Sequence, residues 1–308
     1  MALHVPVMVA EVLAASQPEK ATNLVDMTVG GAGHAQALMA LAPPNARLVA
    51  IDRDQAALEM ARPALAKYAD RVEFVHSRYS RLPDILAEAG MDHADVVLLD
   101  AGASRDQLVD PERGFSFASD VHLDMRQSRD EPLTAHIVVN EYSLADLGAV
   151  LSRTGKAREA RRIAARIAAS RPINSTAQLA DIIAAAVAKP YGPRGKTRNP
   201  SAEWFMAIRV EVNDEENELI GGIEAGVRAL RPQSGRFVLL TWNGLEHRIA
   251  RSSLRSLINP CRCPPSFPCN CGLKPLASWL AKGDSPTEAE VAQNPSARSC
   301  RLFAVTAA

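Results

Sequence analysis

Three glycines that follow a short apolar run have the spacing of a ligand-binding turn. The run 24–26 is followed by Gly30, Gly31 and Gly33, and an alanine-rich, helix-forming segment comes next. Glycine lets backbone N–H groups approach a ligand without a Cβ in the way. A second apolar run ends in Asp52, whose carboxylate can accept hydrogen bonds from both hydroxyls of a ribose. Together they predict a nucleoside-bearing cofactor at the carboxyl ends of a parallel sheet. The alternative is a plain strand-to-helix corner.

The glycine turn also restricts the kind of nucleoside. Its glycines do not have the spacing of a dinucleotide fingerprint, and His34 opens the following helix instead. A pyrophosphate seat is therefore disfavoured, and S-adenosylmethionine is the predicted cofactor. Its ribose would bind Asp52, and its charged amino-acid end would lie over the turn at Gly30.

A third apolar run ends in Asp100, and the small residues 101–104 that follow leave room beside a ligand. Strand ends are where ligands bind in parallel sheets, so Asp100 is a second candidate beside Asp52. The alternative for both is that they cap the next helix. Tyr79 could lie against an adenine ring, or it could simply pack half-buried. Ser104 is by itself an ordinary polar loop residue.

Strand-like and helix-like segments alternate in the first hundred residues, which is typical of a parallel α/β sheet. The predicted strands are 24–26, 48–52, 72–76 and 96–100. Only helical segments follow until about residue 213, the clearest being 156–170. Strand character returns at 236–242, then come a helix, a Pro/Cys-rich loop and a last strand at 301–305. We therefore predict a discontinuous α/β domain, 1–110 and 213–308, that is interrupted by a helical insertion, 111–212, for substrate recognition.

Charge is distributed unevenly in a chain whose 308 residues carry no formal net charge. Between Arg153 and Arg198 there are 11 Lys and Arg residues against two acidic ones. Such a surplus fits a surface that follows RNA phosphates, and it fits a solvated face equally well. The candidate phosphate contacts are Arg158, Arg162, Arg166, Lys196 and Arg198.

Five cysteines clustered late in the chain do not form the pattern of a secreted disulfide framework. Four of them, Cys261, Cys263, Cys269 and Cys271, make two Cys-x-Cys pairs. Zinc ligands usually have two or more residues between them, so a reduced loop without metal is favoured over a zinc site. Without a membrane-spanning run or a signal peptide, we expect a cytoplasmic enzyme without membrane contact, and a homodimer stays open.

The chain resembles the MraW family, the bacterial methyltransferases that act on cytosine N4 of small-subunit ribosomal RNA. The likeness runs nearly end to end, and 110–117 and 123–126 are its most specific parts. The matching segments are His4–Val7, Asp26–His34, Ile51–Asp54, Leu98–Asp100 with Gln107-Leu108, Asp110–Phe117, Leu123–Arg126 and Asn294–Ser299. The resemblance implies an α/β class I (Rossmann-like) S-adenosylmethionine-dependent methyltransferase fold with an inserted all-helical domain. It also implies cofactor contacts from Ala32, Gly33, His34, Asp52, Tyr79, Asp100 and Gln107.

The activity implied is methyl transfer from S-adenosylmethionine to the N4 amine of a cytosine in 16S ribosomal RNA. Asp100, Ser104 and Asn140 are the candidates for positioning that amine. The chain departs from the family at Arg105, Glu203 and the pair 243–244. These departures keep two alternatives open: a diverged N-methyltransferase acting on a peptide, a small amine or another RNA, and a binding protein without activity.

Overall fold

A computed structural model describes residues 6–116, 120–187, 201–264 and 270–308. The chain divides into two compact units. The first, Met1–Gly102 with Glu216–Ala308, is called the α/β unit, and the second, Ala103–Glu215, is called the helical unit. The first boundary thus lies nearer the end of the fourth strand than the predicted position after residue 110. Gln107, which follows this boundary, donates a hydrogen bond to the Gln127 carbonyl within the helical unit.

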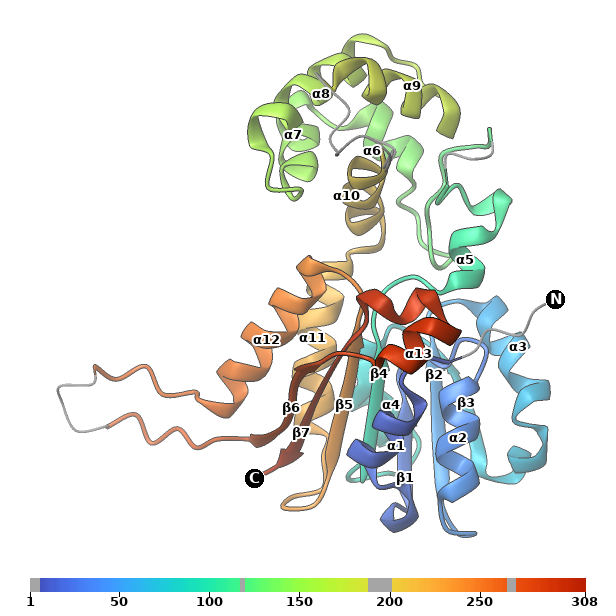
Figure 1. The fold of residues 1–308 in the computed structure, drawn as a ribbon, viewed down its shortest axis with the longest axis vertical. Coiled ribbons are helices and arrows are strands. Elements are labelled where there is room, and N and C mark those ends of the chain that lie inside the picture. The colour runs from blue at the N-terminus through green and yellow to red at the C-terminus, as the bar shows by residue number, and fades with distance from the viewer. Residues whose placement is uncertain (1–5, 117–119, 188–200, 265–269) are drawn as a thin grey trace. The chain divides into compact units, whose positions relative to one another are not determined.

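One sheet of seven strands organises the described part of the α/β unit (Figure 1). Its strand order is β3-β2-β1-β4-β5-β7-β6, and only β7 runs antiparallel to its neighbours. This topology is that of the class I methyltransferase fold, so the predicted fold class is confirmed. The strands are β1 (Asn23–Asp26), β2 (Arg47–Asp52), β3 (Val72–His76), β4 (Val96–Asp100), β5 (Arg236–Thr241), β6 (Ala277–Asp284) and β7 (Arg301–Ala307).

Helices cover both faces of this sheet, which explains why its central strands are apolar throughout. Successive strand residues point to opposite faces. Leu24 and Leu48 accordingly pack with the helices of one face, and Val25 and Val49 pack with those of the other. The first face carries α1 (Val9–Ser16), α2 (Gly33–Leu41) and α3 (Gln55–Ala64). The second carries α4 (Leu82–Glu88), α11 (Glu215–Arg228) and α12 (Gly244–Ile258). A short helix, α13 (Glu288–Gln293), precedes β7.

The sequence pattern did not predict the edge strand β6. Only Ala277 and Ala281 are buried along its eight residues. Its second half, Lys282-Gly283-Asp284, has residue types that are depleted in strands. An edge strand buries little, so its alternation of apolar and polar residues is weak.

The helical unit contains α5 to α10 and a core of its own. Ser104, Thr134, Ser143 and Ser175 cap α5, α6, α7 and α9 with their side-chain oxygens. The core gathers side chains from α6 to α10, including Ile163, Ile183 and Trp204. The helices are α5 (Arg105–Val109), α6 (Ala135–Glu141), α7 (Leu144–Ser152), α8 (Ala157–Ala169), α9 (Thr176–Ala186) and α10 (Ala202–Asn213). Within the described ranges, no helix of either unit has the length and apolar character to cross a membrane.

Candidate active site

Three carboxyl groups lie at one edge of the sheet, because β2 and β4 flank β1 and all three strands run parallel. Asp26, Asp52 and Asp100 are the last residues of the three strands. Burial, with the added repulsion of Asp100 and Asp52, raises the pKa of Asp26 to about 7. Thr28 joins two of the strands, since its N–H donates to Asp26 and its hydroxyl accepts from Asp100 N at 2.8 Å.

The buried Asp26 should make stability depend on pH. Between about pH 4 and 7 the folded chain keeps a proton on Asp26 that the unfolded chain has lost, so the free energy of unfolding falls as pH rises. Asp26→Asn removes this charge, and its advantage over wild type should grow to on the order of 2 to 4 kcal/mol at pH 8. Urea unfolding at pH 4 to 8 measures it, with the exposed Asp92→Asn as control. If the difference in free energy of unfolding between Asp26→Asn and wild type does not change with pH, the pKa of Asp26 is not raised.

Asp52 holds the glycine turn and keeps capacity for a ligand. Its Oδ2 accepts from Gly30 N at 3.0 Å and its Oδ1 from Asp54 N at 2.9 Å. Each carboxylate oxygen has two lone pairs, so each can accept one further hydroxyl. Gly30 has φ +48° and Gly31 faces open space, since nothing lies within 4 Å of where its Cβ would be. A carboxylate with acceptor capacity beside an open glycine turn fits the ribose and amino-acid end of S-adenosylmethionine.

The start of α2 is packed so tightly that few other residue types could replace Ala32, Gly33 and His34. Ala32 precedes the helix with φ +64°. A Cβ on Gly33 would lie 2.9 Å from the Pro6 ring. The imidazole of His34 is hydrogen-bonded to the Val7 carbonyl through Nε2 at 2.9 Å, and its Nδ1 lies 4.0 Å from Asp100 Oδ2. The structure therefore brings the predicted residues of the turn together with Asp100, and their contact with a cofactor stays a prediction.

Two residues that the sequence did not single out fix Asp100. Trp242, just after β5, donates its indole N–H to Asp100 Oδ1 at 2.7 Å. Glu246, buried in the first turn of α12, accepts from Trp242 N at 2.6 Å. Gly102 has φ +96°, and a Cβ there would lie 3.2 Å from the Glu246 carboxylate. The pattern Asn243-x-x-Glu246, a helix-capping signal, was the clue available in the sequence.

Trp242 is therefore a positioning residue whose effect can be measured. Trp242→Phe keeps an aromatic side chain, although a smaller one, and removes the hydrogen bond to Asp100. A hydrogen bond to a charged group contributes about 1.5 to 3 kcal/mol, so we expect cofactor affinity or kcat to fall about tenfold or more. Calorimetry and initial rates separate the two, and Trp279→Phe on the edge strand is the matched control. If Trp242→Phe and Trp279→Phe have the same cofactor affinity and the same kcat, Trp242 does not position Asp100.

Tyr79 follows β3, whose last residue, His76, pairs with Asp52. The ring packs on α11, because a Cβ on Gly222 would lie 2.4 Å from it. The next residue, Ser80, donates to Glu218 of the same helix at 2.7 Å. The half-buried packing that the sequence left open is thus present, and the predicted stacking on adenine is untested.

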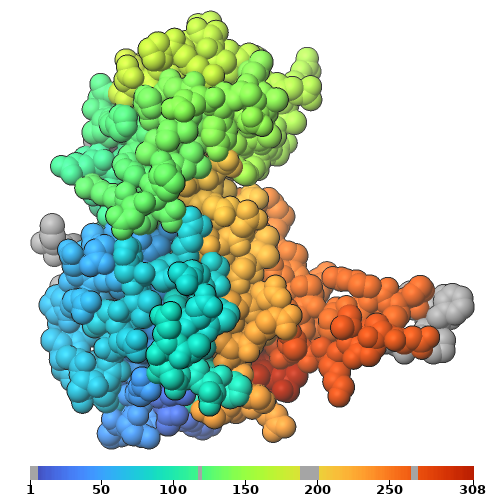
Figure 2. Space-filling view, turned by 180° about the vertical axis from the view of Figure 1, so that it is seen from behind, coloured from blue at the N-terminus to red at the C-terminus, as the bar shows by residue number. Residues whose placement is uncertain are grey.

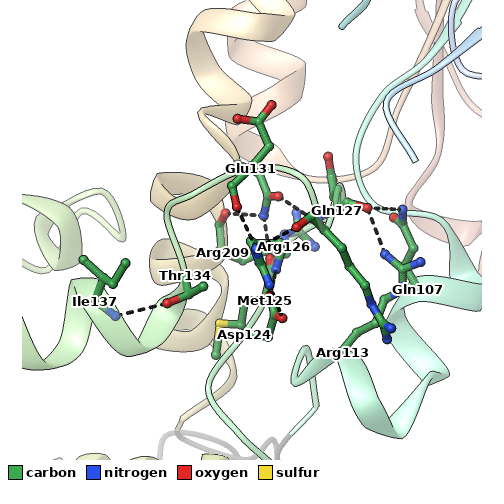
Figure 3. A network of polar contacts seen from close by, with 12 residues as sticks. Gln107, Arg113, Asp124, Met125, Arg126, Gln127, Glu131, Thr134, Ile137 and Arg209 are labelled. Carbon is green, nitrogen blue, oxygen red and sulfur yellow. Dashed lines mark hydrogen bonds and ion pairs between the residues drawn. The ribbon is translucent and has the colours of Figure 1, made fainter. Parts of the chain in front are cut away.

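The described parts of the most idiosyncratic segments, 110–116 and 123–126, form a polar network within the helical unit (Figure 3). Arg113 donates to the Gln127 carbonyl at 2.8 Å, and Met125 N donates to the Arg113 carbonyl at 2.9 Å. Asp124 accepts two hydrogen bonds from the Arg126 guanidinium, at 2.7 and 2.9 Å. Arg113 therefore joins the two segments, and the pairing of Asp124 with Arg126 stabilises the second segment internally.

Comparison with known proteins decides the family. The sequence profile of the MraW methylase family matches residues 1–308. The chain belongs to the MraW methylase family. S-adenosylmethionine is the methyl donor expected of a methylase with this fold, and the predicted cofactor is confirmed at this level.

Relatives of this family member resemble it over nearly the whole chain. A protein of Geotalea daltonii named ribosomal RNA small subunit methyltransferase H is 42% identical over 307 residues, which are 98% of this chain and 97% of that protein. A protein of the same name from Symbiobacterium thermophilum is 39% identical, covering 98% and 96%. Among solved structures, an rRNA methylase from Streptococcus thermophilus covers 96% of this chain and 94% of its own at 9% identity, with a TM-score of 0.42.

Two of the departures from the family's sequence pattern, Glu203 and Asn243, make contacts within their own units. Glu203, the reversed charge, forms an ion pair of 2.5 Å with Lys156 in the helical unit. Asn243 caps α12, since its side-chain oxygen accepts from Leu245 N and Glu246 N. Both replacements therefore have partners within their own unit.

Three predicted residues of the helical unit have structural partners. Ser104 and Gln107 form a reciprocal capping box, with hydrogen bonds of 3.1 and 3.0 Å. Asn140 donates to the His136 and Ile173 carbonyls and accepts from Ile173 N at 2.8 Å. These bonds use both donors of the Asn140 amide, and its oxygen, which receives one N–H, can accept one further hydrogen bond. The roles of all three toward cofactor or substrate stay predictions.

The basic row lies on α8, opposite the side that packs into the core. Arg158, Arg162 and Arg166 are exposed, whereas Ile163 and Ile167 are buried. Within the described part of the chain, these three arginines form no ion pair. Lys196 and Arg198 lie outside the described residues.

Proposed function

We propose that the chain transfers a methyl group from S-adenosylmethionine to the N4 amine of a cytosine in 16S ribosomal RNA. The supporting observation is the family match over all 308 residues, which spans both units, together with relatives named for the small-subunit ribosomal RNA. Small-subunit RNA, free or assembled, is therefore the proposed partner.

The α/β unit supplies the cofactor side of this reaction. The cofactor, when bound, provides an electrophilic methyl group on a sulfonium. Asp52 would hold the ribose through its remaining acceptor positions, and the open Gly31 leaves the turn accessible. Asp100 is held by Trp242 at the end of β4, where its second oxygen lies 4.0 Å from His34 Nδ1.

A cytosine amine is a weak nucleophile because its lone pair is delocalised into the ring. The protein must hold the amine in line with the methyl group and accept hydrogen bonds from its N–H groups. A carboxylate fixed in orientation serves this purpose, since it costs no rearrangement at the moment of reaction. Asp100 is such a group, and we assign it this positioning.

Methyl transfer from tritiated cofactor to small ribosomal subunits that lack the modification tests the proposal. Digestion of the RNA should release label in N4-methylcytidine. Label in another nucleoside, a peptide or a small amine would instead support the diverged enzyme. Cofactor binding without transfer to any of these would leave a binding protein, and both outcomes would overturn the proposed target.

A further inference from the structure

A segment of the α/β unit that methyl transfer does not use brings three thiols together. The chain leaves α12 at Asn259 and returns at β6. Figure 1 shows the described parts of this segment, in orange, running away from the sheet, and Figure 2 shows them projecting from the surface. Cys261, Cys263 and Cys271 lie on it, and their sulfur atoms are all within 4.8 Å of one another. We call 259–276 the cysteine loop.

The described residues of the cysteine loop, 259–264 and 270–276, contribute no buried side chain to a hydrophobic core. None of its described residues is buried, and none belongs to a helix or strand. The backbone hydrogen bond from Leu276 N to the Leu257 carbonyl, at 2.9 Å, closes its base. Without a core or regular structure in the described parts of the loop, another constraint is needed to bring together side chains that are eight and ten residues apart. Bound metal is one such constraint that small domains use.

The arrangement of the thiols fits a metal ion. Zinc binds thiolates at about 2.3 Å, which puts tetrahedral ligands about 3.8 Å apart. The observed limit of 4.8 Å lies within about 1 Å of this spacing. Cys263 N donates to Cys261 Sγ at 3.4 Å, and N–H groups directed at a ligand sulfur stabilise the thiolate form. The Cys-x-Cys spacing was the argument against zinc in the sequence. In the structure, the same spacing allows the hydrogen bond from Cys263 N to Cys261 Sγ.

We propose that Cys261, Cys263 and Cys271 are three ligands of a structural zinc site that holds the cysteine loop together. Soft thiolate donors without carboxylates favour zinc over magnesium or calcium. On binding, three S–H bonds are exchanged for three zinc–sulfur bonds, and three protons are released to solvent. The fourth position belongs to water or to a further ligand, and Cys269 lies outside the described residues.

Metal content and a cobalt spectrum test the site in the full chain. Protein purified without chelator should hold about one zinc per chain by mass spectrometry. Refilling chelator-treated protein with Co²⁺ should give thiolate charge-transfer absorption and the strong visible bands of a tetrahedral ion. Titration with Zn²⁺ in weak buffer should release about three protons.

Variants separate a built site from incidental binding. Cys261→Ser, Cys263→Ser and Cys271→Ser should each lower zinc occupancy at least about tenfold. Cys300→Ala is the matched control, because Cys300 is fully buried in the sheet core and burial raises the pKa of its thiol. Lys274→Ser controls for change in the loop. Occupancy below about one tenth in zinc-supplemented cells, a disulfide in the fresh protein, or zinc retained in the triple serine variant would each overturn the proposal. The cobalt spectrum of wild type decides the matter even if a variant fails to fold.

Discussion

Replacement of Asp52 by alanine should weaken binding of S-adenosylmethionine by on the order of 100-fold or more. Two effects combine in this variant. The ribose loses its charged acceptor, and the glycine turn loses the carboxylate that receives Gly30 N at 3.0 Å. Each hydrogen bond to a charged group contributes about 1.5 to 3 kcal/mol, so the loss of two suffices. Isothermal titration with the cofactor and with its demethylated product measures the change.

The protonation of Asp52 should make cofactor binding depend on pH. Burial raises the pKa of Asp52 to about 6, so the group gains a proton as pH falls through 6. Cofactor affinity of wild type should therefore decline below about pH 6, and the affinity of Asp52→Ala should lack this decline. Asp92→Ala, at an exposed position, controls for loss of a carboxylate. Wild-type affinity in Asp52→Ala, with the fold intact by circular dichroism, would disprove the cofactor site.

The strand-end carboxylates could be predicted because local sequence is enough to locate them. An apolar run marks a buried strand, and parallel strands bring their carboxyl ends to one edge. Asp52 and Asp100 were found in this way, and the glycine turn was found from the residues that interrupt the first run. Asp26 was visible by the same rule, and its burial became apparent only when its neighbours in the sheet were known.

Contacts between distant parts of the chain could not be predicted in the same way. Trp242 reaches Asp100 across 142 positions of sequence, because β5 pairs with β4. Nothing in either local pattern specifies that pairing. The thiols of the cysteine loop illustrate a second difficulty, since the spacing of two cysteines says little about where a third one folds back. Strand β6 illustrates a third, because an edge strand has too little burial to impose a pattern.

Reversal of the charge on the basic row should reduce affinity for 16S ribosomal RNA by about 100-fold or more near 0.1 M salt. Arg158, Arg162 and Arg166 are exposed on α8, and none pairs with an acidic group among the described residues. Replacing all three by Glu removes three phosphate contacts and adds repulsion. The slope of log affinity against log salt concentration is negative, and its magnitude should decrease by about two to three because three phosphate contacts are lost. Filter binding or fluorescence anisotropy over a salt series measures both quantities.

The salt slope separates RNA contact from a general change of charge. Arg228, Arg251 and Arg255 are exposed on helices of the α/β unit, and their replacement by Glu changes the net charge equally. A long-range effect of charge would lower affinity alike in both triple variants, whereas direct contact from α8 lowers the slope only in the first. Cofactor affinity should be unchanged in both, since neither set touches the strand-end carboxylates. If the α8 variant keeps wild-type affinity and slope, its arginines form a solvated face and the RNA surface lies elsewhere.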